Sequence, residues 1–267
     1  MSVFATYGVL AGSGKLDADV AAFLTATGIT DATIRNALNT FVKGLKLNGL
    51  WTKAKAIYPF VGGTAFTHKW NLKDPRDLDA AFRLVFNGTV THSSAGATGN
   101  GTNGYYNTFV NPSTNLAQNS ASAFLYQGTN AAGVNGTLDF GCYNAGGTSR
   151  IYYIKRSAVN NTQGACNNAG NNLAFTGTTD ARGFGGITRT SSASFLFVNE
   201  STTANAVVTS AAPPNFNIYG MCYNNAGTAT GFTNRTHAFM WLGDGLTDTE
   251  AGTLRTLVNT LQSNLGR

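Results

Sequence analysis

The three cysteines of the chain each precede a similar polar run: GCYNAGGT around Cys142, ACNNAG around Cys166 and MCYNNAGT around Cys222. A structural zinc site needs paired thiolates only a few residues apart, whereas these cysteines lie far apart and have no histidine near them. A disulfide stays as the alternative, although three cysteines cannot all pair. The pattern favours a repeated strand–turn–strand in which Asn and Gly form the turn and the cysteine is a small buried side chain.

Carboxylates are the next candidates, because sandwich-fold glycosidases use one as an acid and another as a nucleophile or base. Glu200 and Glu250 are the only glutamates, and Glu250 stands three residues after Thr247, the spacing of a helix-capping box. Three aspartates stand singly near strand ends or turns, without the spacing of a calcium loop: Asp139, Asp180 and Asp244. We therefore expect no catalytic residues, no metal and no cofactor.

Other catalytic signals are also weak. His68, His92 and His237 are scattered along the sequence, and we expect each to be a packed or hydrogen-bonded structural residue. No serine lies in a G-x-S-x-G elbow, and the GTNG and GGT sequences lack the G-K-[ST] ending of a phosphate loop.

A binding function demands less of the sequence. Loops rich in Asn, Ser, Gly, Thr and Tyr combine adaptable hydrogen bonds with rigid aromatic faces, which suits both sugars and protein surfaces. The alternative for each residue is a turn former or an aromatic on a strand face. The candidate ligand-binding residues are Tyr105, Tyr106, Tyr143, Asn144, Asn167, Asn168, Asn171, Asn172, Tyr223 and Asn224.

Composition excludes other partners. The net charge of +6 is spread along the chain without a basic run, so we expect no nucleic-acid partner. The sequence has no apolar stretch long enough to cross a bilayer and no signal peptide at residues 1–20. Low charge with 42% hydrophobic residues instead predicts a globular chain with a substantial core.

Periodicity predicts the elements that position these residues. Apolar residues at helical spacing indicate helices over residues 17–27 and from 30 or 31 to 48, and the capping box opens a third over 247–265. From about residue 80, short runs of β-branched and aromatic residues alternate with turn residues: AFRLVFNGTVTHSS, SASAFLYQG, GTLDFGCYN, SRIYYIKRS, NNLAFTG, ASFLFVNES and FNIYGMCYN. Such a series predicts an antiparallel sandwich or jelly roll.

The domain organisation follows from these elements. We expect an N-terminal arm over residues 1–16 and one domain over 17–267, which includes helices within 17–50 and the helix over 247–265. The Gly- and Asn-rich piece over 93–108 is interpreted as a long loop within that domain.

Three longer segments resemble bacteriophage virion proteins that carry a concanavalin A-like, or laminin-G-like, lectin/glucanase sandwich. They are AIYPFVGGTAFTHKWNLKDPRDLDAAFRLVF, HSSAGATGNGTNGYYNTFVNPS and NRTHAFMWLGDGLTDTEAGTLRTLVNTLQSNLGR. The resemblance implies a mainly β fold, a two-sheet antiparallel jelly-roll sandwich with two N-terminal helices and one C-terminal helix packed outside. The glutamates on which the glucanase branch depends are absent from this chain.

Three functions remain open. The first is a non-enzymatic protein of the virion surface, a tail-fibre tip or adhesin that binds a host-surface glycan or receptor. The second is a structural or decoration protein of the capsid, neck or tail that binds no receptor and docks through its N-terminal arm. The third, a glycan-cleaving depolymerase, lacks its carboxylate pair. The setting implies other virion proteins as partners and a homo-oligomer, with a trimer favoured.

Overall fold

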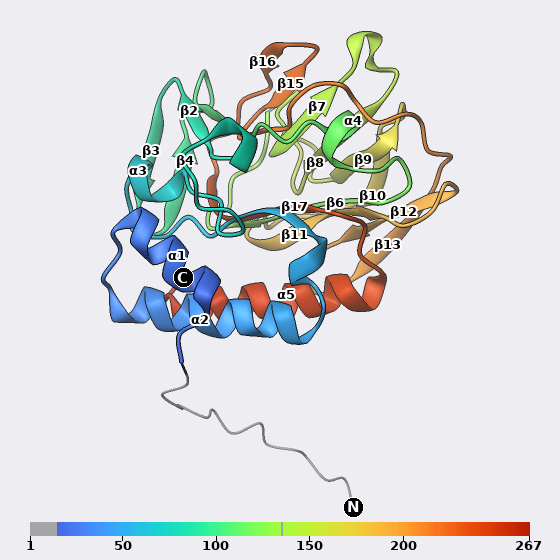
Figure 1. The fold of residues 1–267 in the computed structure, drawn as a ribbon. Coiled ribbons are helices and arrows are strands. Elements are labelled where there is room, and N and C mark those ends of the chain that lie inside the picture. The colour runs from blue at the N-terminus through green and yellow to red at the C-terminus, as the bar shows by residue number, and fades with distance from the viewer. Residues whose placement is uncertain (1–14, 135) are drawn as a thin grey trace, which may run out of the picture.

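The computed structural model describes residues 15–134 and 136–267. The chain forms three layers: a helical layer and two β-sheets, which we name sheet A and sheet B, with sheet A in the middle (Figure 1). The predicted N-terminal arm lies outside the described residues up to residue 14.

Sheet A is the middle layer, and eight of the described strands form it. Two of its long strands are buried along their whole length, as expected for strands covered on both faces. In spatial order the strands are β13 (Thr203–Val207), β12 (Ser194–Val198), β11 (Gly183–Arg189), β6 (Ala121–Gln127), β17 (Thr236–Gly243), β4 (Gly96–Gly99) and β3 (Val90–Ser93), and β1 (Ala54–Tyr58) also pairs with β17.

Sheet B packs on sheet A through one of its faces. The opposite face of sheet B, which we call its open face, is not covered by another layer of the described chain. Its pairs are antiparallel except for β15 and β7, which run parallel. The order is β10 (Asn172–Phe175), β9 (Thr162–Asn168), β8 (Arg150–Ile154), β7 (Phe140–Tyr143), β14 (Tyr219–Gly220), β5 (Tyr105–Asn107) and β2 (Val85–Asn87), and the hairpin of β15 (Tyr223–Asn225) and β16 (Thr228–Thr230) joins at β7.

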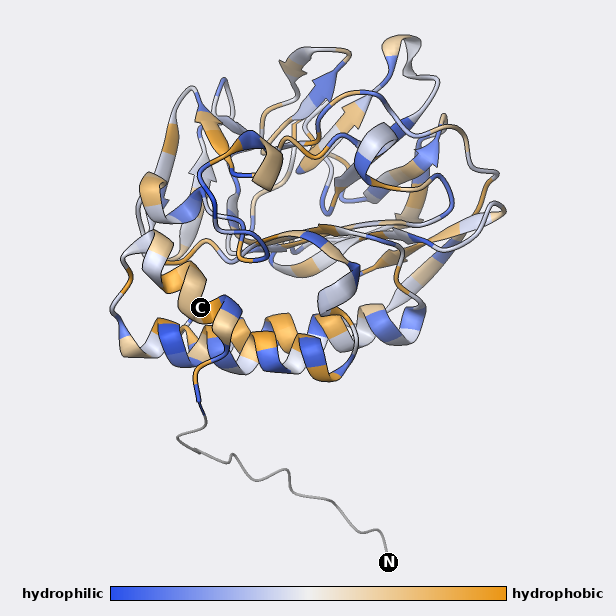
Figure 2. Ribbon diagram, in the orientation of Figure 1, coloured by the Kyte–Doolittle hydropathy of each residue, from blue (hydrophilic) through white to orange (hydrophobic). Residues whose placement is uncertain are grey.

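The helical layer confirms the three predicted helices: α1 (Ala18–Thr27), α2 (Ala32–Leu47) and α5 (Asp248–Asn264). The capping box of α5 is present, with Thr247 and Glu250 bonding to each other's backbone N–H. Apolar and polar residues alternate along α2 and α5 (Figure 2). Among the described helices, none is long and apolar enough to span a membrane. The short helices are α3 (Ala65–His68) and α4 (Pro112–Asn115), with 3-10 turns at Trp51–Lys53, Asp79–Ala81 and Ala145–Gly147.

Two cores hold the layers together. Alternation along β6 sends Phe124 toward the helices, where it stacks on Phe184, and Leu125 toward sheet B. Phe41 of α2 meets Phe239 of β17 edge to face, with ring centroids 5.6 Å apart. The predicted sandwich with helices outside is therefore confirmed.

Some predicted elements were wrong in detail. Residues 93–108 are not one loop, because β4 and β5 form within them and pair with strands in two different sheets. Residues 54–58 form β1 and residues 162–168 form β9, and neither strand was among the predicted segments. Gly and Asn mask the strand signal of β4 and β9, since their place in a strand depends on partners and not on propensity.

One end of the sandwich interior holds a fully buried ion pair. Arg235, the residue just before β17, donates to Asp139, the residue just before β7, at 2.5 Å, and neither side chain is exposed. The other carboxylate oxygen of Asp139 accepts from the backbone N–H of Lys155 at 2.8 Å. Two sheets are thereby joined through one buried carboxylate.

The histidines are structural residues, as predicted. The Nδ1 atoms of His68 and His92 lie 3.0 Å apart and share a hydrogen bond. His237 is fully buried, and its Nδ1 lies 2.8 Å from the hydroxyl of Tyr106. Burial lowers the pKa of His68, to about 3, with His92 adding to the effect. Burial likewise lowers the pKa of His237, to about 4.

These low pKa values predict acid sensitivity. In the unfolded chain each histidine takes up a proton near pH 6.5, whereas the folded protein does so near pH 3 or 4. The unfolded state therefore binds more protons between these values, and stability falls as pH drops from about 6.5. We expect His68→Gln to reduce the pH slope of the unfolding free energy by about 1.4 kcal/mol per unit near pH 5. Urea unfolding at several pH values measures it, and a slope equal to that of the wild type would contradict the assignment.

Candidate functional site

The three cysteine repeats all lie in sheet B, where the third is next to the first and β8 separates the first from the second. Cys142 lies on β7, Cys166 on β9, and Cys222 directly precedes β15. Hairpins follow as predicted, with β7 pairing with β8, β9 with β10, and β15 with β16. All three cysteines are free and buried, and burial raises the pKa of each thiol. The repeat therefore encodes backbone geometry.

This geometry brings two tyrosines together on the open face of sheet B. Cys142 belongs to the core between the sheets, so the next residue, Tyr143, points outward. The same order, cysteine then tyrosine, recurs at Cys222 and Tyr223. Because β15 runs parallel to β7, with Asn224 opposite Cys142, the Tyr143 and Tyr223 rings meet with centroids 4.5 Å apart.

A third tyrosine completes an aromatic wall. Tyr152 on β8 lies opposite Gly141 and meets Tyr143 with ring centroids 5.5 Å apart. A Cβ at Gly141 would lie only 2.7 Å from that of Tyr152, so glycine is needed for this close approach. Three rings on adjacent strands form one surface, and we name the cavity beside it the tyrosine pocket.

Arg150 lies across this wall. Its guanidinium carbon is 4.8 Å from the centre of the Tyr143 ring, in the range of a cation–π contact. Its Nε donates to the carbonyl of Gly147 at 3.2 Å, and Nη1 donates to Asn171 Oδ1. Gly147 has a φ of +65°, which only glycine adopts readily. The turn of the first repeat thus fixes the arginine.

Asn171 comes from the turn of the second repeat. Its Oδ1 also accepts from the Tyr152 hydroxyl at 3.0 Å, which sets the orientation of the amide. The amide Nδ2 therefore remains as a donor beside the pocket. All three repeats supply a side chain to one cavity: Tyr143, Asn171 and Tyr223.

The pocket has a volume of about 340 Å³, at the lower end of the usual size of small-ligand sites. Val134 and Val159 stand on its rim and are 70% and 69% exposed. Burial raises the pKa of Tyr143 and of Tyr152, so both phenols keep their protons at neutral pH. The site offers flat apolar faces, phenol and amide donors and one cation.

Two predicted site tyrosines lie elsewhere. Tyr105 is on the same open face but stacks on Tyr219, with centroids 4.9 Å apart, and does not line the pocket. The prediction that Tyr106 is a ligand-binding residue was wrong, because its side chain is fully buried. Alternation turns its side chain into the core, where its hydroxyl lies 2.8 Å from His237.

Three predicted asparagines are also buried, and they satisfy backbone groups. Asn167 donates to the carbonyl of Gln118 at 2.9 Å. The side chain of Asn168 accepts from the backbone N–H of Cys166 on the same strand. Asn224 accepts from the backbone N–H of Gly227 at 2.7 Å. Their side chains are not presented to a ligand, and they are turn and strand-end residues instead.

Asn144 and Asn172 are partly exposed but also act within the fold. Asn144 accepts from the backbone of Asn215 at 2.8 Å, and Asn172 donates to the carbonyl of Gly164 at 3.2 Å. Neither lines the pocket.

Arg150 and Tyr152 were missed from the sequence. They stand two apart in SRIYYIKRS, so they share a strand face. Their spacing in the sequence could have identified them. An arginine and a tyrosine on one face of a predicted strand, next to a repeat turn, indicate that this face points outward.

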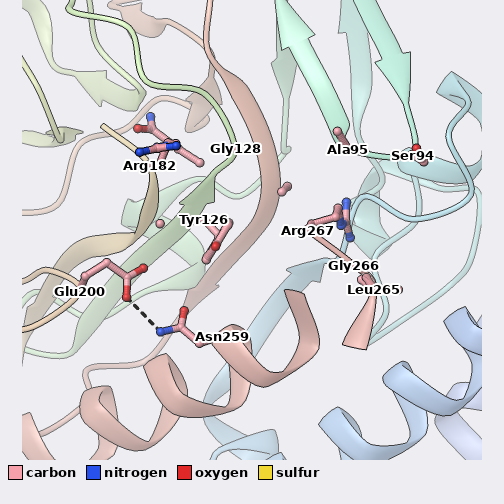
Figure 3. Close-up of a pocket in the computed structure, with 13 residues that line it drawn as sticks. Ser94, Ala95, Tyr126, Gly128, Arg182, Glu200, Asn259, Leu265, Gly266 and Arg267 are labelled. Atoms are coloured by element: carbon pink, nitrogen blue, oxygen red, sulfur yellow. Dashed lines mark hydrogen bonds between the residues drawn. The ribbon is translucent and has the colours of Figure 1, made fainter. Parts of the chain in front are cut away.

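A second cavity lies on sheet A, beside the end of α5 (Figure 3). We name it the α5 cleft. In it Glu200 and Asn259 point toward each other, and Asn259 Nδ2 donates to the carboxylate at 2.9 Å. Tyr126 and Arg182 lie beside them, and Arg267 faces them from across the cleft (Figure 3). Its volume is about 660 Å³.

The three aspartates that stand singly in the sequence each pair with an arginine or lysine side chain. Asp139 pairs with Arg235, Asp180 contacts Arg182 at 2.7 Å, and Asp244 lies 3.2 Å from the Lys55 amine. Within residues 15–134 and 136–267, no group of three His, Cys, Asp or Glu side chains is placed to hold a metal ion.

No family model matches this chain, and no curated protein matches it in sequence. Among solved structures it is similar to domain 4 of AbnA, a GH43 extracellular arabinanase from Geobacillus stearothermophilus, in complex with arabinotriose. That match has a TM-score of 0.45 and 9% identity and covers 77% of this chain and 98% of that one.

Sialidase structures are also similar. The Ruminococcus gnavus IT-sialidase CBM40 bound to α2,3 sialyllactose has a TM-score of 0.40 and 11% identity, with 64% and 94% of the two chains covered. The NanB sialidase from Streptococcus pneumoniae has a TM-score of 0.39 and 12% identity over 54% of this chain, and the match spans only 26% of that protein. These values are low, so we base the site on the residues of this chain alone.

Proposed function

We propose that this protein is a non-enzymatic glycan-binding protein of a bacteriophage virion surface, a tail-fibre tip or adhesin that holds a host-surface sugar in the tyrosine pocket. The observation that supports it most is the convergence of all three cysteine repeats on one cavity. Tyr143, Asn171 and Tyr223, which lie in or next to the three repeats, all line this cavity.

The lining suits a saccharide. A sugar ring has flat faces of C–H groups, which pack on aromatic rings such as those of Tyr143 and Tyr223, and an edge of hydroxyls, which need both donors and acceptors. Asn171, Arg150 and the phenols provide those polar contacts at fixed positions. Aromatic faces combined with a few convergent polar groups are typical of small-ligand binding sites.

The lining also favours binding over hydrolysis. None of the described residues that line the pocket is an aspartate, glutamate or histidine. Glycoside hydrolysis needs a carboxylate pair or an equivalent nucleophile with an acid. The virion setting and a trimeric state rest on the sequence resemblance and remain part of the proposal.

A cell-binding measurement tests this function. Fluorescently labelled protein is added to a panel of intact bacteria, and adsorption of phages to the same cells is measured with and without it. We expect saturable binding to some strains, removed by Tyr143→Ala, and reduced phage adsorption on those strains. Folded protein that binds no strain would overturn the adhesin role and favour a structural role on the particle.

A further inference from the structure

The α5 cleft is a separate cavity from the tyrosine pocket. The tyrosine pocket lies on the open face of sheet B, whereas the cleft is bordered by sheet A strands and the end of α5. Its volume of about 660 Å³ is well within the range of small-molecule sites. A ligand in one cavity therefore does not contact the other.

Two polar atoms beside the cleft are buried without a partner. Among the described residues, these are Asn259 Oδ1 and Arg267 Nε, and both residues line the cleft. Buried polar groups almost always form a hydrogen bond to protein or to an ordered molecule. Two such atoms beside one cavity therefore mark it as a place where a polar ligand would find hydrogen-bond partners.

The side chains are also held in place. Glu200 accepts from the backbone N–H of Phe184 and from Asn259 Nδ2. That second bond fixes the amide, so Asn259 Oδ1 is an acceptor. Arg267 donates to the carbonyls of Phe60 and Pro59 at 3.1 and 3.3 Å, which leaves its Nε free. Such preorganised groups are what a binding site requires.

A glycine makes room for the carboxylate. A Cβ at Gly183 would lie 2.1 Å from Glu200 Oε1, and the residue has a φ of +87°, so this position suits glycine alone. The backbone is thus shaped around Glu200.

Charge and donor types identify the kind of ligand. Arg182 is paired with Asp180 at 2.7 Å, so the other charged side chains among the described residues that line the cleft are Arg267 and Glu200, which balance. Burial lowers the pKa of Arg267 only to about 10, so it stays charged at neutral pH. An anion attracted by Arg267 would also meet Glu200, and a cation attracted by Glu200 would also meet Arg267, so the cleft favours neither charge.

Hydroxyl groups fit this mixture, because each one both donates and accepts. Asn259 Oδ1 and Glu200 accept, and Arg267 and Tyr126 donate. We propose that the α5 cleft is a second ligand site, which binds an uncharged polyhydroxylated molecule the size of a mono- or disaccharide.

The test uses the Tyr143→Ala protein, so that the tyrosine pocket is disabled and failure of one site does not conceal the other. Saturation-transfer NMR is recorded with D-glucose, D-galactose, N-acetyl-D-glucosamine and maltose, and with glycine and inorganic phosphate as probes of the other ligand classes. We expect a signal from at least one sugar. Adding Asn259→Leu should weaken its binding about tenfold or more, and adding Tyr126→Phe about threefold.

The Tyr126→Phe change removes one oxygen only and keeps the test valid if Asn259→Leu fails to fold. No sugar signal in the Tyr143→Ala protein would overturn the second site. Signals unchanged by both cleft substitutions would do so as well. Binding of glycine or phosphate without any sugar would overturn the ligand class.

Discussion

Replacing Tyr143 by alanine is expected to weaken glycan binding about 30-fold, which corresponds to about 2 kcal/mol. Tyr143 stands at the centre of the site, since it contacts the Tyr152 and Tyr223 rings and carries the Arg150 guanidinium over its face. Its loss removes a stacking surface and frees the arginine at the same time. Isothermal titration with a glycan that binds the wild type measures the change.

Tyr105→Ala is the matched control. Tyr105 lies on the same open face and is also stacked on a tyrosine, but it does not line the pocket. We expect its replacement to change the affinity less than about threefold, as for most residues outside a binding hot spot. Equal losses for both variants, or a larger loss for Tyr105→Ala, would place the site elsewhere on sheet B.

The second large effect concerns stability. Asp139→Ala is expected to lower the free energy of unfolding by about 3–5 kcal/mol, because it leaves the Arg235 charge buried without its partner. The backbone N–H of Lys155 loses its acceptor as well. Urea unfolding followed by tryptophan fluorescence measures the change.

An exposed pair provides the comparison. Asp180 contacts Arg182 at 2.7 Å, and both side chains are about half exposed. Since surface pairs contribute about 0–1 kcal/mol, Asp180→Asn should scarcely change stability. A loss for Asp139→Ala no larger than that for Asp180→Asn would show that the buried pair does not hold the two sheets together.

Much of the fold is predictable because it depends on local patterns. The spacing of Leu38, Phe41 and Leu45 predicted α2, and the pair Thr247 and Glu250 predicted the start of α5. Several strands were predicted from their aromatic and β-branched residues. The layer order was not accessible, because which face of a strand meets helices depends on partners distant in the sequence.

The site was predictable only in part. Tyr143, Asn171 and Tyr223 were among the candidates because they lie in or next to repeat turns, and the structure places them in one pocket. Tyr105 and Tyr106 point to opposite faces of sheet B because side chains alternate along a strand. The sequence predicted a loop here, so the direction of neither side chain could be predicted. The stack of Tyr143 on Tyr223 needs the parallel pairing of β15 with β7, a long-range register that no local pattern encodes.

The most direct measurement is binding of the purified protein to an array of bacterial surface polysaccharides and isolated glycans, with wild type and Tyr143→Ala side by side. The account predicts that the wild type binds a limited set of glycans and that the variant, equally folded by circular dichroism, loses them. Identical binding by the two proteins, or no binding by the wild type, would contradict a glycan site built from the three repeats.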